Sequence, residues 1–234
     1  MKVSVVIPAF NEEKYISKTL ESVNSLEKDN LNIEVLVVDA HSKDKTAEIA
    51  ESYGAKIISE PHKGIGFARQ QGLKHAQGEI VAFTDADTVV PKNWLKRHIE
   101  VLQKGNNVFS YGTFRVIDGK FPYFHYINYL QPRILWLMHY LFGKEIAAGQ
   151  NLAFWREKAL SIGGFNDQLK VMEDIDLAVR MSKIGKTVFI PDLVVYSSGR
   201  RSLEGWAFFS RMIGILIRYF LFGVKKFPLF PDFR

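Results

Sequence analysis

The chain has 234 residues, and nearly half of them are apolar, which suits one large packed domain or one domain with an added segment. It contains no cysteine, so disulfide bonds and thiolate metal sites are excluded. The formal net charge of +6 suits anionic partners such as nucleotides or acidic lipids, but the basic residues are too scattered for nucleic-acid binding to be expected.

The first 110 residues alternate between buried strands and helices. The N-terminal apolar run stops at Pro8 and acids follow it, which is not the pattern of a signal peptide. Strands are predicted at 2–10, 33–40, 55–60 and 79–87, and helices after Asn11, at 45–53, at 66–76 and from Pro91 onward. This alternation predicts a mainly parallel central sheet with helices on both faces.

Acidic side chains follow three of these strands. Glu12 follows the first strand, Asp39 ends the second, and Asp85 and Asp87 end the fourth. Any one of them could simply mark where a strand gives way to a polar loop. In open parallel sheets, however, ligands bind outside the carboxyl ends of the strands. The set, converging on one edge, therefore favours a binding site.

The chain lacks the glycine-rich motifs that usually hold phosphates. Neither GxGxxG after the first strand nor GxxxxGK[ST] occurs, so a dinucleotide fold and a P-loop are not expected. A divalent cation on Asp87, helped by Asp85, would neutralise phosphates instead. Mg²⁺ and Mn²⁺ prefer oxygen ligands and commonly join one or two carboxylates to substrate phosphates.

Residues 121–142 are rich in aromatic side chains and poor in charge, and Pro132 argues against one straight helix. This stretch reads either as an ordinary core segment or as an acceptor groove or membrane-facing surface.

Three acids, Glu173, Asp174 and Asp176, lie at the start of a helix that ends before Gly185. They could serve only the helix dipole. Asp174 and Asp176 do not share a helical face, so one can face a cleft while the other faces solvent. A carboxylate at a helix start that faces a cleft is a candidate general base.

These pieces together resemble the family 2 glycosyltransferases, which have the GT-A nucleotide-diphospho-sugar transferase fold. The similarity covers about residues 3–195 and follows the family's order. Its elements are SVVIPAFNEEKYI at 4–16, VVDAHSKDKT at 37–46, GFARQQGL at 66–73, DAD at 85–87, GQNLAFWR at 149–156, GGFN at 163–166 and EDIDLAVR at 173–180.

The resemblance implies a role for each matching position. On the donor side, the nucleotide site would include Pro8, Ala9, Glu12, Asp39, Gly66 and Arg69. Gly66 would leave room for the donor, and Arg69 would lie near the pyrophosphate. In the DAD motif, Asp85 would meet the ribose or the metal, Ala86 lies between the two acids, and Asp87 would bind Mg²⁺ or Mn²⁺ and the diphosphate. Asp174 would be the catalytic base. On the acceptor side lie Glu173, Gln150 and Asn151.

The chain departs from the family at two positions. His41 follows Asp39 where the family usually has Asp or Gly before Gly-Ser, so base recognition is expected to differ. Ser197 and Ser198 stand where many relatives have a metal-binding histidine, so no histidine ligand is predicted. Arg200 and Arg201 follow and could contact phosphate of the donor or of a lipid acceptor, or form a solvated basic loop.

Residues 206–227 form an amphipathic segment rather than a spanning one, because Arg211 and Arg218 interrupt its apolar runs. These arginines and Lys225 are spaced by seven and fall near one line on a helix. The pattern predicts a helix lying in a membrane interface with the basic stripe toward anionic headgroups. The alternative is a helix packed on the domain or in a dimer.

The sequence thus predicts a GT-A catalytic domain at 1–200, with a nucleotide-sugar-binding half at 1–110 and an acceptor-side half at 111–200, and a helical tail at 201–234. The predicted function is metal-dependent, inverting transfer of a sugar from a nucleotide sugar to an acceptor hydroxyl or phosphate, with a lipid-linked acceptor as one option. The predicted location is the cytoplasm, at the inner face of the membrane. Two alternatives stay open: a sugar-phosphate nucleotidyltransferase, and a non-catalytic peripheral module that binds sugar nucleotides.

Overall fold

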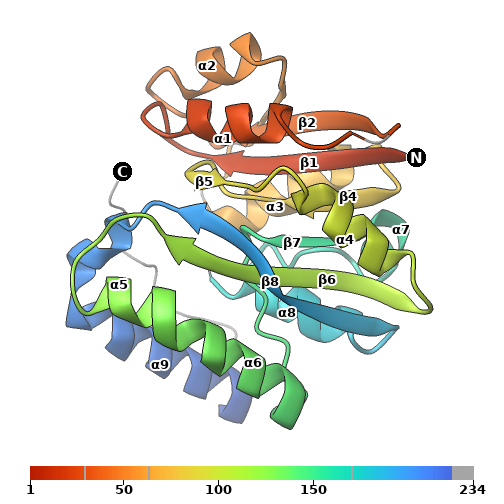
Figure 1. Ribbon diagram of the computed structural model, residues 1–234. Coiled ribbons are helices and arrows are strands. Elements are labelled where there is room, and N and C mark those ends of the chain that lie inside the picture. Colours follow the sequence, from red (N-terminus) through yellow and green to blue (C-terminus); the bar gives the residue numbers. More distant parts are fainter. Residues whose placement is uncertain (29, 63, 170, 223–234) are drawn as a thin grey trace.

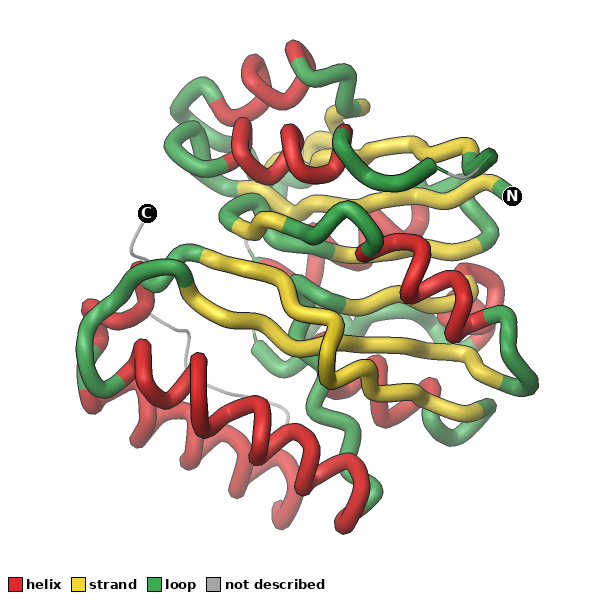
Figure 2. The backbone as a smooth tube through the Cα atoms, viewed as in Figure 1, coloured by secondary structure: helices red, strands yellow, loops and turns green. Residues whose placement is uncertain are grey.

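The computed structural model describes residues 1–28, 30–62, 64–169 and 171–222 (Figure 1). Within these residues the strands form one eight-stranded sheet in the order β3-β2-β1-β4-β7-β6-β8-β5. Figure 2 shows this sheet as a twisted yellow layer with red helices against it.

The first half of the sheet is parallel, as predicted. β1 pairs with β2 and β4, and β2 pairs with β3, all in parallel. The elements are β1 (Lys2–Ala9), α1 (Ile16–Asn24), β2 (Asn32–Asp39), α2 (Thr46–Ser52), β3 (Lys56–Ser59), α3 (Ile65–His75), β4 (Ile80–Phe83), β5 (Thr88–Val89) and α4 (Trp94–Leu102). The parallel strands bring the ends of β1, β2 and β4 to one edge.

The second half is mixed. β7 runs antiparallel to both β4 and β6, β6 and β8 are parallel, and the short β5 is antiparallel to β8. The elements are β6 (Asn107–Val116), α5 (Tyr123–His125), the π-helical segment η1 (Tyr126–Leu130), α6 (Gln131–Phe142), β7 (Leu152–Trp155), α7 (Arg156–Ser161), α8 (Glu173–Met181), β8 (Lys186–Ser197), the 3₁₀ segment η2 (Arg200–Glu204) and α9 (Trp206–Phe222). Parallel pairings still outnumber antiparallel ones among the described strands, as predicted.

Two apolar cores cover the two faces of the sheet. Alternate residues of β1 face opposite sides, so that Val5 belongs to one core and Val6 to the other. Helices α1, α2 and α4 contribute to the first core, and α3, α7 and α8 contribute to the second. The predicted arrangement with helices on both faces is therefore confirmed.

The aromatic stretch at 121–142 is not one straight helix, as Pro132 predicted. It consists of α5, η1 and α6, and Pro132 lies in the first turn of α6 directly after the π segment. Proline has no backbone N–H to donate to the preceding turn, so it is tolerated at a helix start.

Helix α9 packs against the second half of the domain. Phe208 joins a cluster with Tyr123 and Ile127, and Ile215 joins one with Met172 and Ile175. Figure 1 shows α9, in blue, running alongside α5 and α6, in green. No helix in the described ranges combines the length and apolar character that a bilayer span requires. Residues 223–227 of the predicted interfacial segment, Lys225 included, lie outside the described residues.

One local prediction is wrong. The helix predicted directly after Asn11, α1, begins only at Ile16. Asn11 instead adopts a left-handed φ of 53°, and its side-chain oxygen accepts a hydrogen bond of 2.8 Å from the Lys43 amide. It ties the loop after β1 to the loop after β2.

Candidate active site

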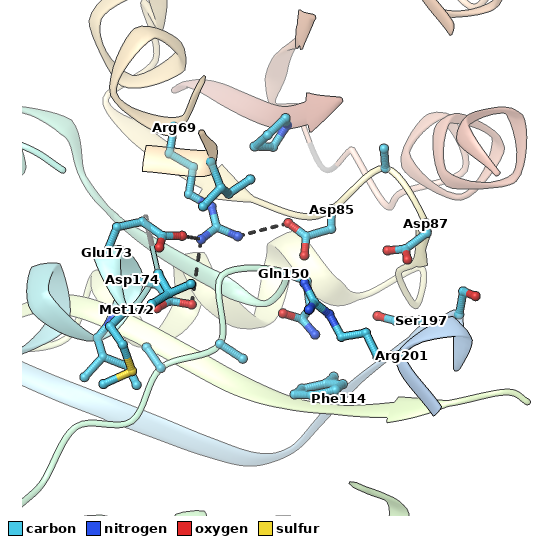
Figure 3. A pocket seen from close by; sticks show the side chains of 18 of the residues that line it. Arg69, Asp85, Asp87, Phe114, Gln150, Met172, Glu173, Asp174, Ser197 and Arg201 are labelled. Carbon is cyan, nitrogen blue, oxygen red and sulfur yellow. Dashed lines mark hydrogen bonds and ion pairs between the residues drawn. The ribbon is translucent and has the colours of Figure 1, made fainter. Parts of the chain in front are cut away.

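A cavity of about 510 Å³ opens at the edge of the sheet where β1 and β4 end. Its volume is in the usual range for a small-molecule site. It is lined by Pro8 and Ala9 at the end of β1, by Glu12 just after β1, and by Asp85, Ala86 and Asp87 after β4. Glu173 and Asp174 reach it from the start of α8 (Figure 3). The structure thus brings most of the predicted site residues together.

Arg69 of α3 links the two groups of acids. Its Nη2 lies 3.0 Å from Asp85 Oδ1, and its Nη1 pairs with Glu173 Oε1 and lies 3.7 Å from Asp174 Oδ2 (Figure 3). The side chain is almost fully buried. Burial disfavours its charge, but the three carboxylates outweigh this effect and raise the pKa of Arg69. Its position beside the acids makes it a fixed positive centre of the cavity.

The two acids at the start of α8 differ in their surroundings. The side chain of Glu173 is 4% exposed and that of Asp174 is 18% exposed. Asp174 Oδ2 accepts a hydrogen bond of 2.8 Å from the Gly149 amide, and Oδ1 accepts one of 2.8 Å from the Ile175 amide. Burial raises the pKa of both acids, and Arg69 opposes the rise. Asp174 is thus held in a fixed orientation and remains accessible.

A second arginine, Arg200, pairs with the acids Glu12 and Asp87. Arg200 donates two hydrogen bonds of 2.7 Å to the carboxylate of Glu12, and its Nη2 lies 2.9 Å from Asp87 Oδ2. It also stacks over the Tyr15 ring at 5.1 Å. The pKa of Asp87 is raised to about 6, mainly by burial and also by the charges of Asp85 and Glu12, while the charge of Arg200 opposes the rise. Arg200 is therefore no solvated loop residue.

The charges that line the cavity fit a cation. Five carboxylates, from Glu12, Asp85, Asp87, Glu173 and Asp174, face three guanidinium groups, which leaves two negative charges in excess when all are ionised. Within the described residues, no three His, Cys, Asp or Glu side chains form a metal cluster. Asp85 and Asp87 would therefore need phosphate oxygens or water to complete the coordination of Mg²⁺ or Mn²⁺.

Two predicted donor contacts lie beside the cavity rather than in its wall. Asp39 is buried, and its Oδ2 accepts a bond of 3.1 Å from the Ser42 amide, whereas its Oδ1 has no hydrogen-bond partner. The neighbouring Ala40 lines the cavity. Gly66 does not line it: a Cβ there would lie 2.8 Å from the Leu169 carbonyl oxygen, so the glycine makes room for that backbone rather than for a donor.

On the acceptor side, Gln150 lines the cavity but Asn151 does not. Asn151 is fully buried, accepts hydrogen bonds from Trp94 and His98, and donates to the carbonyls of Thr113 and Leu193. All its polar atoms are used inside the core, so the predicted acceptor contact is wrong for this residue.

Asp176 is also structural. It does not face solvent, because it is buried and its Oδ2 lies 2.7 Å from Arg180 Nε. Arg180 in turn donates to the carbonyls of Ile162 and Gly164. Asp174 and Asp176 have different surroundings, as their positions on the helix predicted, but Asp176 faces Arg180 rather than solvent.

The sequence analysis missed Gly149. A Cβ at this position would lie 1.9 Å from Arg69 Nη2, so only glycine lets the backbone reach both Arg69 and Asp174. The signal was available, because Gly149 begins the GQN motif. The contact of Tyr15 with Arg200 had no comparable sequence signal.

Comparison with known proteins identifies the family. The sequence model for glycosyl transferase family 2 matches residues 4–159. An uncharacterised glycosyltransferase of Rickettsia typhi is 28% identical over 207 residues, which are 83% of this chain and 63% of that protein. The Escherichia coli enzyme WfgD, a UDP-Glc:alpha-D-GlcNAc-diphosphoundecaprenol beta-1,3-glucosyltransferase, is 35% identical over 121 residues, 50% of this chain and 47% of that enzyme.

Solved structures confirm the GT-A fold. The mannosyltransferase PcManGT from Pyrobaculum calidifontis, solved with GDP-Man and Mn²⁺, superimposes with a TM-score of 0.75 and 22% identity, and covers 97% of this chain and 65% of that one. This chain therefore spans less than two thirds of the length of each of these three proteins.

Proposed function

This chain belongs to glycosyl transferase family 2, and we propose that it transfers a sugar from a nucleoside-diphosphate sugar to an acceptor oxygen with inversion at the anomeric carbon. One observation carries the proposal. The acids that suit a metal and a diphosphate, Asp85 and Asp87, line the same cavity as Asp174, an accessible carboxylate held in place by two backbone amides.

The donor would lie along the ends of β1 and β4. Pro8, Ala9 and Glu12 would contact the nucleoside, and the partnerless oxygen of Asp39 would accept a hydrogen bond from the base or ribose. The diphosphate would lie near Asp85 and Asp87, within reach of the guanidinium groups of Arg69 and Arg200. Asp39 itself does not line the cavity, but its neighbour Ala40 does.

The chemical step needs a base on one side of the sugar and a leaving group on the other. Asp174 accepts the proton of the acceptor O–H, and the acceptor oxygen forms a bond to the anomeric carbon. The bond from that carbon to the diphosphate oxygen breaks, and its electron pair leaves with the nucleoside diphosphate. One displacement inverts the configuration and needs no covalent sugar–enzyme intermediate.

A divalent cation held by Asp87 and Asp85 would neutralise the charge of the departing diphosphate. The excess of two negative charges in the cavity supports this assignment, and so does the Mn²⁺ bound to PcManGT. Arg69 holds Glu173 and Asp85 in position on either side of the reacting centre.

We further propose a lipid-linked acceptor and contact with a membrane surface. The name of the E. coli relative gives it a diphosphoundecaprenol-linked acceptor. The described part of α9 supports a surface contact because Trp206, Ile213 and Ile217 remain exposed on the side away from the packed residues Phe208 and Ile215. The proposal includes a location at the inner face of the cell membrane.

The test is a panel of UDP- and GDP-sugars with Mn²⁺, with membrane lipid extracts as acceptors and free nucleoside diphosphate as the readout. Asp174→Asn should lower transfer about 10²- to 10⁴-fold while donor binding persists. Asp176→Asn is the matched control on the same helix and should keep its activity per folded molecule.

Three results would contradict the proposal. Transfer near the wild-type rate in Asp174→Asn would exclude this residue as the base. Donor binding without any nucleotide release would favour the non-catalytic module, and release of pyrophosphate from a nucleoside triphosphate and a sugar phosphate would favour the nucleotidyltransferase.

A further inference from the structure

The cavity continues from the carboxylates into a mainly apolar compartment. Its walls come from β6, η1, α6 and α9. We name this part the apolar compartment, and it is lined by Tyr126, Ile127, Leu135, Phe208, Met212 and Ile215. The donor-side acids and these residues line one continuous space, so an occupant that fills it is polar at one end and apolar at the other.

The apolar compartment reaches the proposed base. Ile215 of α9 packs with Met172 and Ile175, which lie on either side of Glu173 and Asp174 in the sequence. Helix α9 therefore forms a wall next to the reacting centre. A free sugar would find few hydrogen-bond partners against this wall, and stripping water from its hydroxyl groups without new partners would be unfavourable.

A cationic group lies where the polar and apolar parts meet. Arg201 lines the cavity, and Figure 3 shows its side chain reaching in beside Gln150 and over Phe114. Its Nη1 lies 3.9 Å from Glu204 Oε1, and 46% of the side chain is exposed. A guanidinium group in this position is complementary to a phosphate that carries a hydrocarbon chain.

The outer surfaces around the compartment are apolar as well. Helix α6 exposes Trp136, Tyr140 and Leu141, and α9 exposes Trp206 and Ile213. Trp and Tyr are enriched at membrane–water interfaces, because one end of each ring system is polar. If these surfaces lie against a membrane, a hydrocarbon chain that leaves the compartment between α6 and α9 would enter lipid rather than water.

From these observations we propose that the apolar compartment binds the hydrocarbon chain of a phosphate-bearing lipid acceptor, with the phosphate at Arg201 and the reacting oxygen at Asp174. This inference rests on the proposed transferase function and specifies its acceptor class. It also gives α9 a role in acceptor binding through Phe208, Met212 and Ile215.

The test uses monoalkyl phosphates of four to ten carbons, below their micelle concentration, binding to the full chain by calorimetry. Each methylene that enters the compartment should tighten binding roughly fourfold, until the compartment is full. Met212→Glu places a carboxylate in the compartment and should weaken binding of decyl phosphate at least tenfold. Ile213→Glu adds the same charge on the exposed face one residue away and should bind like the wild type.

The outcomes separate this inference from the proposed function. An affinity that does not change with chain length in the wild-type protein overturns it, whether or not Met212→Glu folds. Equal losses in Met212→Glu and Ile213→Glu also overturn it, because the chain would then lie on the outer surface. Binding of nucleotide sugar with Mn²⁺ is measured on the same sample. If the protein binds the donor but its affinity for alkyl phosphates does not depend on alkyl length, the acceptor inference is wrong and the proposed function stands.

Discussion

Replacing Arg69 with glutamine tests whether the buried charge cluster is held together as described. The guanidinium of Arg69 contacts Asp85, Glu173 and Asp174 within 3.7 Å and is almost fully buried. Removing one partner from a buried charge group leaves the other charges uncompensated, which typically costs about 3–5 kcal/mol. For a domain of this size the melting temperature should fall by roughly 6–20 °C.

The loss should depend on pH in a defined direction. Arg69 opposes the rise that burial causes in the pKa values of Glu173 and Asp174, so the variant should raise both further. A folded pKa above the unfolded value means that the folded state binds more protons between the two values. Stability then falls as pH rises through that window. The destabilisation by Arg69→Gln should therefore be larger at pH 8 than at pH 5.

Urea unfolding at the two pH values measures this effect, with Arg97→Gln as the matched control. Arg97 Nη2 donates to both carboxylate oxygens of Asp192 at the surface, so its loss should cost at most about 1 kcal/mol and show little pH dependence. If Arg69→Gln loses no more stability than Arg97→Gln, or loses more at pH 5 than at pH 8, the account of the cluster is wrong.

Three further predictions follow from single residues. Gly149→Ala should lower donor-dependent nucleotide release at least tenfold because its Cβ would collide with Arg69, whereas Gly214→Ala, with nothing within 4 Å, should leave release unchanged. Burial lowers the pKa of His98 to about 4, so stability should fall by roughly 3 kcal/mol as pH drops from about 6.5 toward 4, and His98→Gln should flatten that part of the urea-derived curve. Asp87→Asn should weaken Mn²⁺ binding measured by electron paramagnetic resonance at pH 7.5; unchanged binding would remove Asp87 from the metal site.

The first half of the fold could be predicted because its central strands, β1 and β4, are buried on both faces. Runs such as residues 2–9 are almost continuously apolar and end at a proline or an acid, and both signals are local. The edge at which Asp85 and Asp87 meet Glu12 follows from the parallel pairing alone. The general position of the site was therefore available before any contact was known.

The finer assignments depend on contacts that sequence patterns do not encode. Gln150 and Asn151 are neighbours, yet one lines the cavity and the other joins His98 and Trp94 in the core. Arg200 reaches Glu12 across 188 positions of the chain. The pairing of Arg200 with Glu12 depends on the path of β8 and η2, which brings Arg200 back to the edge of the sheet. Local sequence periodicity does not predict that path.

Arg69, which is buried, and Arg200, which is half-buried, explain how so acidic a cavity is stabilised. Arg69 and Arg200 each contact acids from different segments, so every carboxylate of the cavity lies near a guanidinium group before any substrate arrives, although two negative charges remain in excess. A donor that brings a divalent cation and a diphosphate would exchange these partners: Asp87 would hold the cation, and the guanidinium of Arg200 would contact the diphosphate. Because each charge keeps a partner of opposite sign throughout, the exchange avoids the large cost of exposing an unpaired buried charge. The same argument explains why a cation and a diphosphate should be better ligands together than either is alone.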